Sequence, residues 1–512
     1  MNDSEIMVTV KPIPSGFLTE FKGFLQGSFW YTFGGMLSRV VAIVLIPLYT
    51  HYLSSSEYGI IGITSMVTSL VIFIVAMGLP EAVMRFYIDV EHEAQERRTF
   101  LTTILIFQLV FCSVIAAIIS LSGGKLFNAI IKDVPFSPYI IFGIWVGFFQ
   151  AIITTVPLQL FRIRKESLRY VVFNTIFLII TTFLTVYFIV FKQQGALGSL
   201  KGALYSSILM SIVLIASIRQ SLGWSFSIHQ LQRILVFSIP LLPQGIFFWL
   251  MGLSDRAILG VHVELAEIGV YTLAYQFALI IQVVNLAVDG SWRAFLFRAV
   301  NDQKKHLWIQ RLGTYYVVGI AFVGWSIAVF GVYVIKLATP VSYHRAILVL
   351  PFLCFAIYLL VFYQIWSDGI LVTKNTKGLP IIAMIAAIFG VTLNLLLIPK
   401  YGIVAAALNS IIVYGTLAAG AYFISFKINP ISYEYVRWIK VTFVAVVLGF
   451  IAYHLSFGAV LLDIIAKLGL VFIWPLSLYF IGFWTEQELT VIKAYLSRLL
   501  PGRHRKSGSS FH

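Results

Sequence analysis

The sequence predicts an all-α membrane protein that crosses the bilayer many times. Sixty per cent of its 512 residues are apolar and only 11% are charged, whereas soluble domains are about half apolar and about a quarter charged. The apolar residues form fourteen long runs, separated by short charged or turn-rich breaks. Because backbone groups in lipid must hydrogen-bond within their own segment, and a bilayer core of ~30 Å needs ~20 helical residues, each run has the length of a membrane span.

The predicted helices follow one another with little chain between them, so no soluble domain is expected. Prolines at or within several spans leave carbonyls without intrahelical partners, and they mark either kinks used in motion or simple packing bends. The fourteen predicted spans are 27–49, 58–80, 99–122, 139–160, 170–191, 200–218, 234–254, 268–290, 312–335, 346–367, 378–398, 402–425, 440–457 and 460–483.

Two short segments recur about 200 residues apart. Glu57-Tyr58-Gly59 precedes the second span and resembles Glu267-Ile268-Gly269 before the eighth, while Gly198–Ser206 resembles Gly402–Ser410. Both offsets correspond to six helices, which predicts parallel repeats related by an axis along the membrane normal. The interpretation is two six-helix lobes, 1–220 and 221–432, followed by a helix pair and a basic tail, 433–512. Chance recurrence of Gly and Ala at helix starts is the alternative.

The net charge of +15 is unevenly distributed, and in a membrane chain this distribution indicates topology. With fourteen spans, 26 Lys and Arg residues lie on the side of both termini and nine on the other, while Arg39 lies inside a span. The face carrying Arg162, Arg164, Lys165 and Arg169 is therefore predicted to be cytoplasmic. The basic charge is explained without nucleic-acid binding. The first 23 residues lack the short apolar core of a secretory signal.

Arg39 is the most informative single residue, because it lies near the middle of the first span. An unpaired cation there costs ~2.5–3.5 kcal/mol or more. Ser28, Thr32, Gly35 and Arg39 are spaced to share one helical face. A guanidinium binds phosphate or carboxylate bidentately and keeps its charge, so this face is predicted to meet an anionic ligand. A structural ion pair inside the bundle is the alternative.

A second polar cluster is predicted on spans seven and eight. Span seven carries Gln244, Asp255 and Arg256, and Arg293 follows Asp289 by one turn on span eight. The polar face of span eight consists of Tyr271, Tyr275, Gln282, Asn285 and Asp289. Such a stripe lines either an aqueous cavity or a hydrogen-bonded helix contact. Aromatic rings interleaved with amides suit sugars, but the pattern does not distinguish sugar from another polar cargo.

The remaining polar groups are predicted to have local roles. Glu81 with Arg85, and Asp463 with Lys467, are each one turn apart and are interpreted as ion pairs, while Asp368 is interpreted as an interfacial anchor. The two cysteines and the isolated histidines have no metal-ligand spacing, so no metal or cofactor is expected. Without a phosphate-binding Gly-rich loop, a nucleophile elbow or an HExxH helix, the sequence supports neither ATP hydrolysis nor covalent catalysis.

These residues together resemble a known family. Phe29–Tyr58 with Gly34, Ser38, Arg39 and Pro47, and the segment Ser254-Asp255-Arg256 followed by Glu267, Gly269 and Tyr271, look like polysaccharide biosynthesis exporters. These are the O-antigen (Wzx-like) flippases of the multidrug/oligosaccharidyl-lipid/polysaccharide (MOP) exporter superfamily. The resemblance covers nearly the whole chain, and fourteen helices with both ends in the cytoplasm agree with it.

The resemblance implies that the protein moves an undecaprenyl-diphosphate-linked oligosaccharide across the bacterial cytoplasmic membrane. Arg39, Arg85, Arg256 and Arg293 would then meet the diphosphate or acidic sugars. H+ or Na+ is a candidate coupling ion, with Asp255, Asp289 or Glu81 as carboxylates, and a polysaccharide polymerase is a candidate partner besides membrane lipids.

Two rival functions stay open. A cation-coupled multidrug exporter of the same architecture would favour embedded carboxylates and an apolar pocket. A membrane-embedded glycosyltransferase or polymerase would need a sizeable external catalytic loop, yet the longest predicted one, 123–138, holds only Lys125, Lys132 and Asp133 as charged residues.

The charge bias makes a testable statement about topology. Cysteines placed at Ser137 and Ser199 should react with a membrane-impermeant thiol reagent added to intact cells, and a cysteine at Ser507 should not, because the Lys- and Arg-rich face stays inside. Labelling at Ser507 in sealed cells would reverse the orientation.

Overall fold

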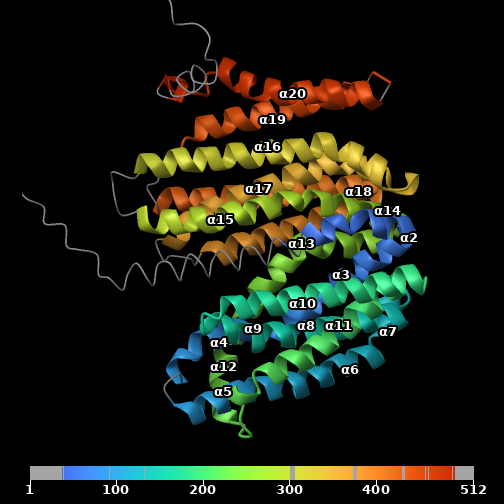
Figure 1. Ribbon diagram of the computed structural model, residues 1–512, viewed down its shortest axis with the longest axis vertical. Helices are drawn as coiled ribbons and strands as arrows, with labels where there is room; N and C mark the ends of the chain where they lie inside the picture. The colour runs from blue at the N-terminus through green and yellow to red at the C-terminus, as the bar shows by residue number, and fades with distance from the viewer. Residues whose placement is uncertain are drawn as a thin grey trace, which may run out of the picture.

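The computed structural model describes residues 37, 40–90, 93–131, 133–299, 306–372, 378–428, 433–455, 457–458, 460–486 and 488–490. Every regular element in these ranges is a helix, which confirms the all-α fold class. The helices run side by side in a long stack (Figure 1). Predicted spans two to fourteen each coincide with a helical segment, whereas the first lies mostly outside the described residues.

The helices before residue 220 pack mainly on one another, with α3 on α8, α8 on α11 and α11 on α10. Short π or 3-10 segments interrupt several of them. The helices of this first group are α2 (Ile46–Tyr52), α3 (Ser55–Ala76), α4 (Leu79–Phe86), α5 (Ala94–Phe107), α6 (Ser113–Ser122), α7 (Gly124–Ile130), α8 (Ile141–Thr155), α9 (Pro157–Ile163), α10 (Ser167–Val186) and α11 (Gly195–Ser217).

The following helices form a second group, in which α17 packs on α16 and α18, and α13 packs on α18. α12 (Ile228–Ser238) connects the groups and contacts α4 and α5 of the first. The remaining helices are α13 (Leu242–His262), α14 (Leu265–Ala278), α15 (Ile280–Ala299), α16 (His306–Ala338), α17 (Ala346–Val372), α18 (Gly378–Ile428), α19 (Tyr435–His454) and α20 (Val460–Phe480).

Eleven helical stretches of the described chain are long and apolar enough to cross a membrane. α18 contains two predicted spans, 378–398 and 402–425, because Gly402 breaks it with a φ of 56° and a ψ of −135°. A residue with a side chain rarely adopts that backbone conformation. The sequence therefore placed this break correctly, and the two arms of α18 lie on either side of it.

The local sequence explains how α3 begins and ends. Ser54 and Glu57 form a capping box: the Ser54 hydroxyl accepts from the Glu57 N–H at 3.2 Å, and the Glu57 carboxylate accepts from the Ser54 N–H at 2.9 Å. The helix stops after Ala76, because Met77 and Gly78 both take left-handed backbone angles. Pro80 then stands in the first turn of α4, where its missing N–H costs no hydrogen bond.

The two groups meet where α3 crosses α14. Gly59 and Gly269 face each other there: a Cβ on Gly59 would lie 2.0 Å from the Leu265 carbonyl oxygen, and one on Gly269 would lie 1.9 Å from that of Ser55. Glycine at both positions therefore permits backbone contact at the crossing. These are the same glycines that recur in the sequence.

A tyrosine from the second group reinforces the same end of the molecule. Tyr343 lies between α16 and α17, and its hydroxyl donates to the Leu53 carbonyl at 3.0 Å. Its ring packs edge-on against Tyr58, with ring centroids 5.9 Å apart. Burial raises the pKa of the Tyr343 phenol, so it stays protonated and continues to donate. The two groups are thus joined at the end of the bundle where α3 and α14 begin.

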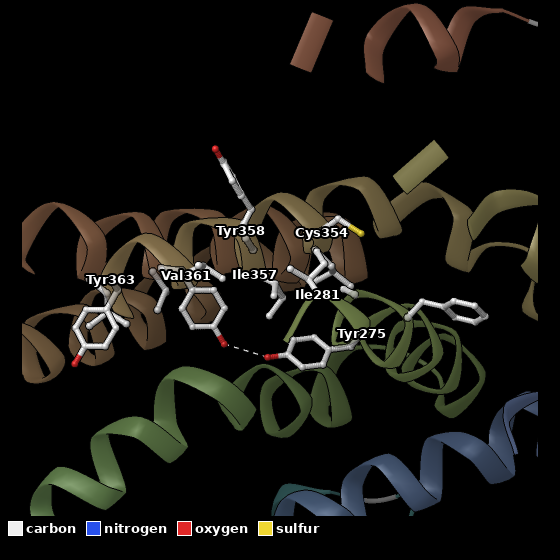
Figure 2. Packing of buried hydrophobic residues seen from close by; sticks show 14 of the residues in the cluster. Tyr275, Ile281, Cys354, Ile357, Tyr358, Val361 and Tyr363 are labelled. Atoms are coloured by element: carbon white, nitrogen blue, oxygen red, sulfur yellow. Dashed lines mark hydrogen bonds between the residues drawn. The ribbon is translucent and has the colours of Figure 1, made fainter. Parts of the chain in front are cut away.

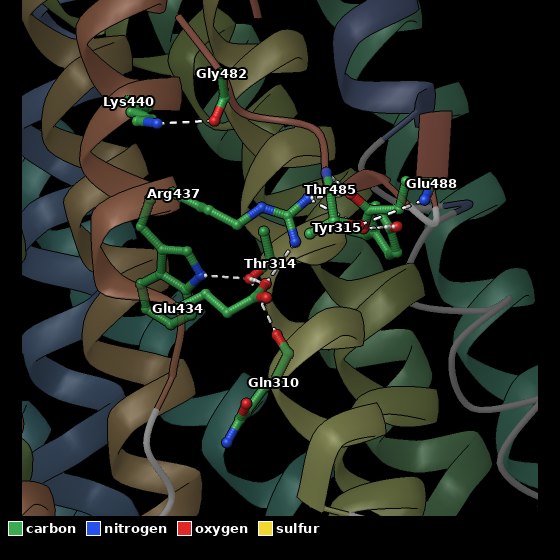
Figure 3. A network of polar contacts seen from close by, with 10 residues as sticks. Gln310, Thr314, Tyr315, Glu434, Arg437, Lys440, Gly482, Thr485 and Glu488 are labelled. Atoms are coloured by element: carbon green, nitrogen blue, oxygen red, sulfur yellow. Dashed lines mark hydrogen bonds and ion pairs between the residues drawn. The ribbon is translucent and has the colours of Figure 1, made fainter. Parts of the chain in front are cut away.

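A buried ion network attaches the last two helices to the second group (Figure 3). α19 and α20 stack outside α16 in Figure 1. Arg437 donates to Glu434 at 2.8 Å and to Glu488 at 2.9 Å. Thr314 of α16 donates to Glu434 at 2.7 Å. Burial acts to raise the pKa of Glu488, but hydrogen bonds from Tyr315 and Thr485 together with the charge of Arg437 hold it below its ordinary value.

The glycine crossing gives a stability prediction. Gly59→Ala should lower the thermal unfolding midpoint of the purified protein, because overpacking a close contact costs about 1–3 kcal/mol. Gly319→Ala is the matched control, since a Cβ there would have nothing within 4 Å. Equal midpoints for the two variants, measured in the same detergent, would show that the contact between α3 and α14 is not rigid.

Candidate functional site

The first polar cluster lies where α13, α14 and α18 meet. Asp255 and Arg256 come from α13, and both are only 4% exposed. The Arg256 guanidinium lies 3.3 Å from the Asp255 carboxylate and stacks over the ring of Tyr275, 4.6 Å from its centroid. Tyr271 donates a hydrogen bond to the same carboxylate. The charge of Arg256 is therefore compensated entirely by neighbours inside the bundle.

A tyrosine pair closes this cluster from the side of α18. The hydroxyls of Tyr275 and Tyr414 are 3.0 Å apart, and the dashed line in Figure 2 marks this contact. Tyr271 is fully buried, and Tyr275 is 8% exposed. With so little surface on any member, the Arg256 cluster acts as a hydrogen-bonded helix contact in this conformation. It has no exposed face for a cargo.

The second polar cluster lies between α15 and α17 and has an exposed face. Arg293 sits between two carboxylates, with Nε 3.1 Å from Asp289 and 2.9 Å from Asp368. The side chain of Asp368 is fully buried and that of Asp289 is 14% exposed, whereas that of Arg293 is 41% exposed. Two carboxylates against one guanidinium leave this triad with one net negative charge, while the group that reaches the surface is the cation.

Neutral amides extend the triad toward the bundle interior. Asn285 donates to the Gln364 side chain at 2.7 Å and to Gln282 at 3.2 Å, and it accepts from the Tyr316 hydroxyl at 2.8 Å. These groups come from α15, α16 and α17. The arrangement places buried amide and phenol groups beside a charged triad whose most exposed member is the Arg293 guanidinium, a hydrogen-bond donor.

The structure thus divides the predicted stripe of span eight into two clusters. The helix is interrupted at Leu279, between α14 and α15. Tyr275 belongs to the Arg256 cluster, while Gln282, Asn285 and Asp289 belong to the Arg293 triad and its amides. Two predicted groups lie outside the description: Arg39 lies outside the described residues, and nothing is described of the Gln244 side chain.

The local pairing predicted for Arg85 is wrong. Arg85 contacts Asp89 at 3.4 Å instead of Glu81, and Asp89 also contacts Arg233 of α12 at 2.7 Å. Glu81 and Asp89 are each one turn from Arg85, but only Asp89 also contacts Arg233 of α12. Arg85, Asp89 and Arg233 therefore form a three-charge cluster on the surface. Asp463 accepts from the Phe457 N–H at 2.6 Å, and Lys467 lies over the Tyr333 ring, 4.9 Å from its centroid.

Asp368 was interpreted from the sequence as an interfacial anchor, and that interpretation is also wrong. It has no exposed surface and completes the Arg293 triad. The signal was present in the sequence, because Gln364 and Asp368 are one turn apart at the end of a mostly apolar span and so share a face. Their partners on α15 are about 80 positions away, and single-helix periodicity does not identify such partners.

The fold and its paired internal charges are those of a polytopic helical membrane protein. A family model described as polysaccharide biosynthesis protein matches residues 24–290, just over half of the sequence. The chain belongs to this family, which confirms the resemblance drawn from its opening segment and from Ser254-Asp255-Arg256. No curated relative matches the chain.

Solved structures share the fold at low sequence identity. The lipid II flippase MurJ, in an inward closed conformation, is 16% identical with a TM-score of 0.67, over 89% of this chain and 98% of MurJ. An inward-facing MATE family multidrug resistance transporter of the MOP superfamily is 14% identical with a TM-score of 0.58. The match covers 77% of this chain and 97% of that transporter. A mutant of the Vibrio cholerae MATE transporter VcmN is 13% identical with a TM-score of 0.55, and the match covers 79% of this chain and 96% of VcmN. The chain therefore shares the fold of this flippase and these MATE transporters.

The triad predicts an order of stability among its variants. Arg293→Gln should lower the unfolding free energy by about 1–3 kcal/mol, because it leaves two carboxylates facing each other without a cation. Asp289→Asn should cost less, since Arg293 keeps Asp368. The double change Asp289→Asn with Arg293→Gln should not recover, because Asp368 is still unpaired, whereas adding Asp368→Asn should restore stability. Membrane abundance and thermal unfolding of the four variants measure this order, and recovery in the double variant would contradict it.

Proposed function

We propose that this protein is a flippase that moves a lipid-linked oligosaccharide, carried on undecaprenyl diphosphate, across the bacterial cytoplasmic membrane. In this proposal both termini are cytoplasmic, and the lobes 1–220 and 221–432 alternate between two arrangements. The product supplies surface polysaccharide synthesis. Membership in the polysaccharide biosynthesis family is the observation that carries the proposal.

The exposed cation of the Arg293 triad supports an anionic cargo. A diphosphate needs permanent cations, which arginine provides through a planar pair of donors. At the Arg293 triad the exposed group is the guanidinium, while its carboxylate partner Asp368 is sealed inside. A headgroup that approaches this surface therefore meets Arg293 first, while the neighbouring amide of Asn285 is buried and paired with Gln364.

The contacts between the two groups support alternating access. Gly59 and Gly269 join the groups at the end where α3 and α14 begin. A cavity between the groups would then open toward the opposite, Lys- and Arg-rich end, where a lipid-linked precursor made in the cytoplasm is available. Separation of the glycine contact and closure of the other end would expose the headgroup outside, with no covalent step.

A cation-coupled multidrug exporter is the alternative, because the fold is shared with MATE transporters. Such a protein needs carboxylates accessible to a cationic drug. Asp255 and Asp368 are almost fully buried, and each contacts an arginine. This arrangement favours the lipid-linked anion over a cationic drug. Both oxygens of Asp368 lack a well-aligned hydrogen bond from the described residues, so we assign Asp368 and Asp289 as the carboxylates that take up a coupling H+ or Na+.

Transport in proteoliposomes tests the proposal. A fluorescent undecaprenyl-diphosphate oligosaccharide is placed in both leaflets, and the protected fraction is read with an impermeant quencher. The wild type should make the inner pool accessible. The triple variant Asp289→Asn, Arg293→Gln, Asp368→Asn should fold but flip at least about tenfold more slowly, because each ~1.4 kcal/mol of lost interaction with the headgroup is tenfold.

Arg98→Gln is the matched control, since it removes an exposed cation away from the triad, and it should flip normally. Efflux of a cationic dye by the wild type, without movement of the glycan lipid, would favour the drug exporter. Normal flipping by the triple variant would remove Arg293 from the cargo site.

A further inference from the structure

A cavity of about 470 Å³ lies on the outside of the first helical group, apart from both polar clusters. It is formed where α9 meets the first turns of α10 and the last turn of α11. Its floor is aromatic: Phe161 and Phe173 stack with centroids 5.4 Å apart and planes 4° from parallel. Its rim is polar, with Arg169, Ser217, Arg219 and Gln220.

The rim of this cavity carries an excess of positive charge. Arg169 pairs with Glu166 at 2.9 Å, yet its side chain is still 68% exposed. Arg219 is exposed and has no ion-pair partner among the described residues. Arg162 and Lys165 are also exposed on the adjoining segment. Glu166 offsets only one of these four cations, so an anion at the rim would compete with a single described carboxylate for the guanidinium groups.

The position of the cavity matches the headgroup layer of a bilayer. α10 begins at Ser167 and α11 ends at Ser217, and both are long enough to cross the membrane, so the rim lies at the ends of two spans. Below the rim, α10 exposes Val172, Ile176 and Ile179, and α11 exposes Val213 and Leu209. A molecule held here would have its charged part at the arginines and a hydrocarbon part along two apolar helices.

We propose that this cavity binds the headgroup of an anionic phospholipid. The phosphate diester would lie between Arg169 and Arg219, where arginine offers paired donors to phosphate oxygens. Ser217 and Gln220 would hydrogen-bond to the polar part of the headgroup, and the acyl chains would follow α10 and α11. Basic pockets between spanning helices bind anionic lipid headgroups for this reason. The zwitterionic phosphatidylethanolamine would bind less well, because its amine faces the same guanidinium groups.

Native mass spectrometry of the purified full-length protein tests this site. The protein is titrated with phosphatidylglycerol or phosphatidylethanolamine in detergent micelles, and lipid adducts are counted. The wild type should retain phosphatidylglycerol preferentially, and Arg169→Gln with Arg219→Gln should reduce that adduct about tenfold. Lys400→Gln with Lys427→Gln removes two exposed cations on α18, away from the cavity, and should keep the wild-type adduct.

A second variant tests the cavity without changing charge. Ala216 lines the cavity and is exposed, so Ala216→Phe should fill it and reduce the phosphatidylglycerol adduct. Retention of the adduct by both the double arginine variant and Ala216→Phe would overturn the proposal. Displacement of the lipid by equimolar inorganic phosphate would also overturn it, since it would assign the cavity to free phosphate. The readout is binding, so it is independent of whether the protein flips a glycan lipid.

Discussion

The compensation of buried charge is the constraint on which the rest of this structure depends. An isolated charge inside a helical membrane bundle is costly, so it persists only with partners. In the described chain, the nearly buried charged side chains all follow residue 220: Asp255, Arg256, Asp368, Arg437, Lys467 and Glu488. Arg256, Arg293 and Arg437 each contact at least one carboxylate. The interior of the first group is instead uncharged where it is described, as in the hydrogen bond from Gln108 to Thr155 at 2.8 Å.

This uneven distribution of buried charge gives the two groups different properties. The second group contains the buried ion networks of the described chain, and we expect it to move as one unit because each arginine contacts groups on more than one helix or turn: Tyr271 and Tyr275 of α14 for Arg256, Asp368 of α17 for Arg293, and Glu488 for Arg437. The Arg437 network also fixes the last helix pair onto α16 (Figure 3).

The repeat proposed from the sequence gains support from a matching detail. Glu57 lies beside Gly195 and Glu267 beside Gly402, and both glycines have left-handed φ values of 55° and 56°. The match pairs Gly402 with Gly195, three residues before the Gly198 chosen from the sequence.

The positions of spans two to fourteen, their order and the break at Gly402 could be predicted because they follow from local properties: apolar run length, proline, and a glycine at a sharp turn. The candidate site could be predicted only in part. Asp289 and Arg293 are one turn apart, so a single helix reveals them, but Asp368 reaches Arg293 from α17, and its role depends on helix packing. The same limit explains why the partner of Arg85 was predicted wrongly, because Asp89 also contacts Arg233 on α12, which is far from Arg85 in the sequence. The polar residues of the Arg256 cluster were predicted, but their burial was not. It involves Tyr414 of α18, which the sequence pattern of α13 and α14 does not identify.

The contacts across the α3 crossing complete the physical argument for movement. Where α3 meets α13 and α14, the described contacts are uncharged: glycine against backbone, the Trp249 indole donating to the Met66 carbonyl at 3.1 Å, and Tyr343 donating to Leu53. Each such hydrogen bond contributes about 0.5–1.5 kcal/mol. Separating the groups here therefore breaks no ion pair, whereas opening the second group would expose Asp255 or Asp368 without its arginine. In the proposed transport cycle this uncharged interface would therefore open and close, and the ion-paired group would move as a unit. This distribution of charge supports a rocking motion about α3 and α14 over rearrangement within the second group.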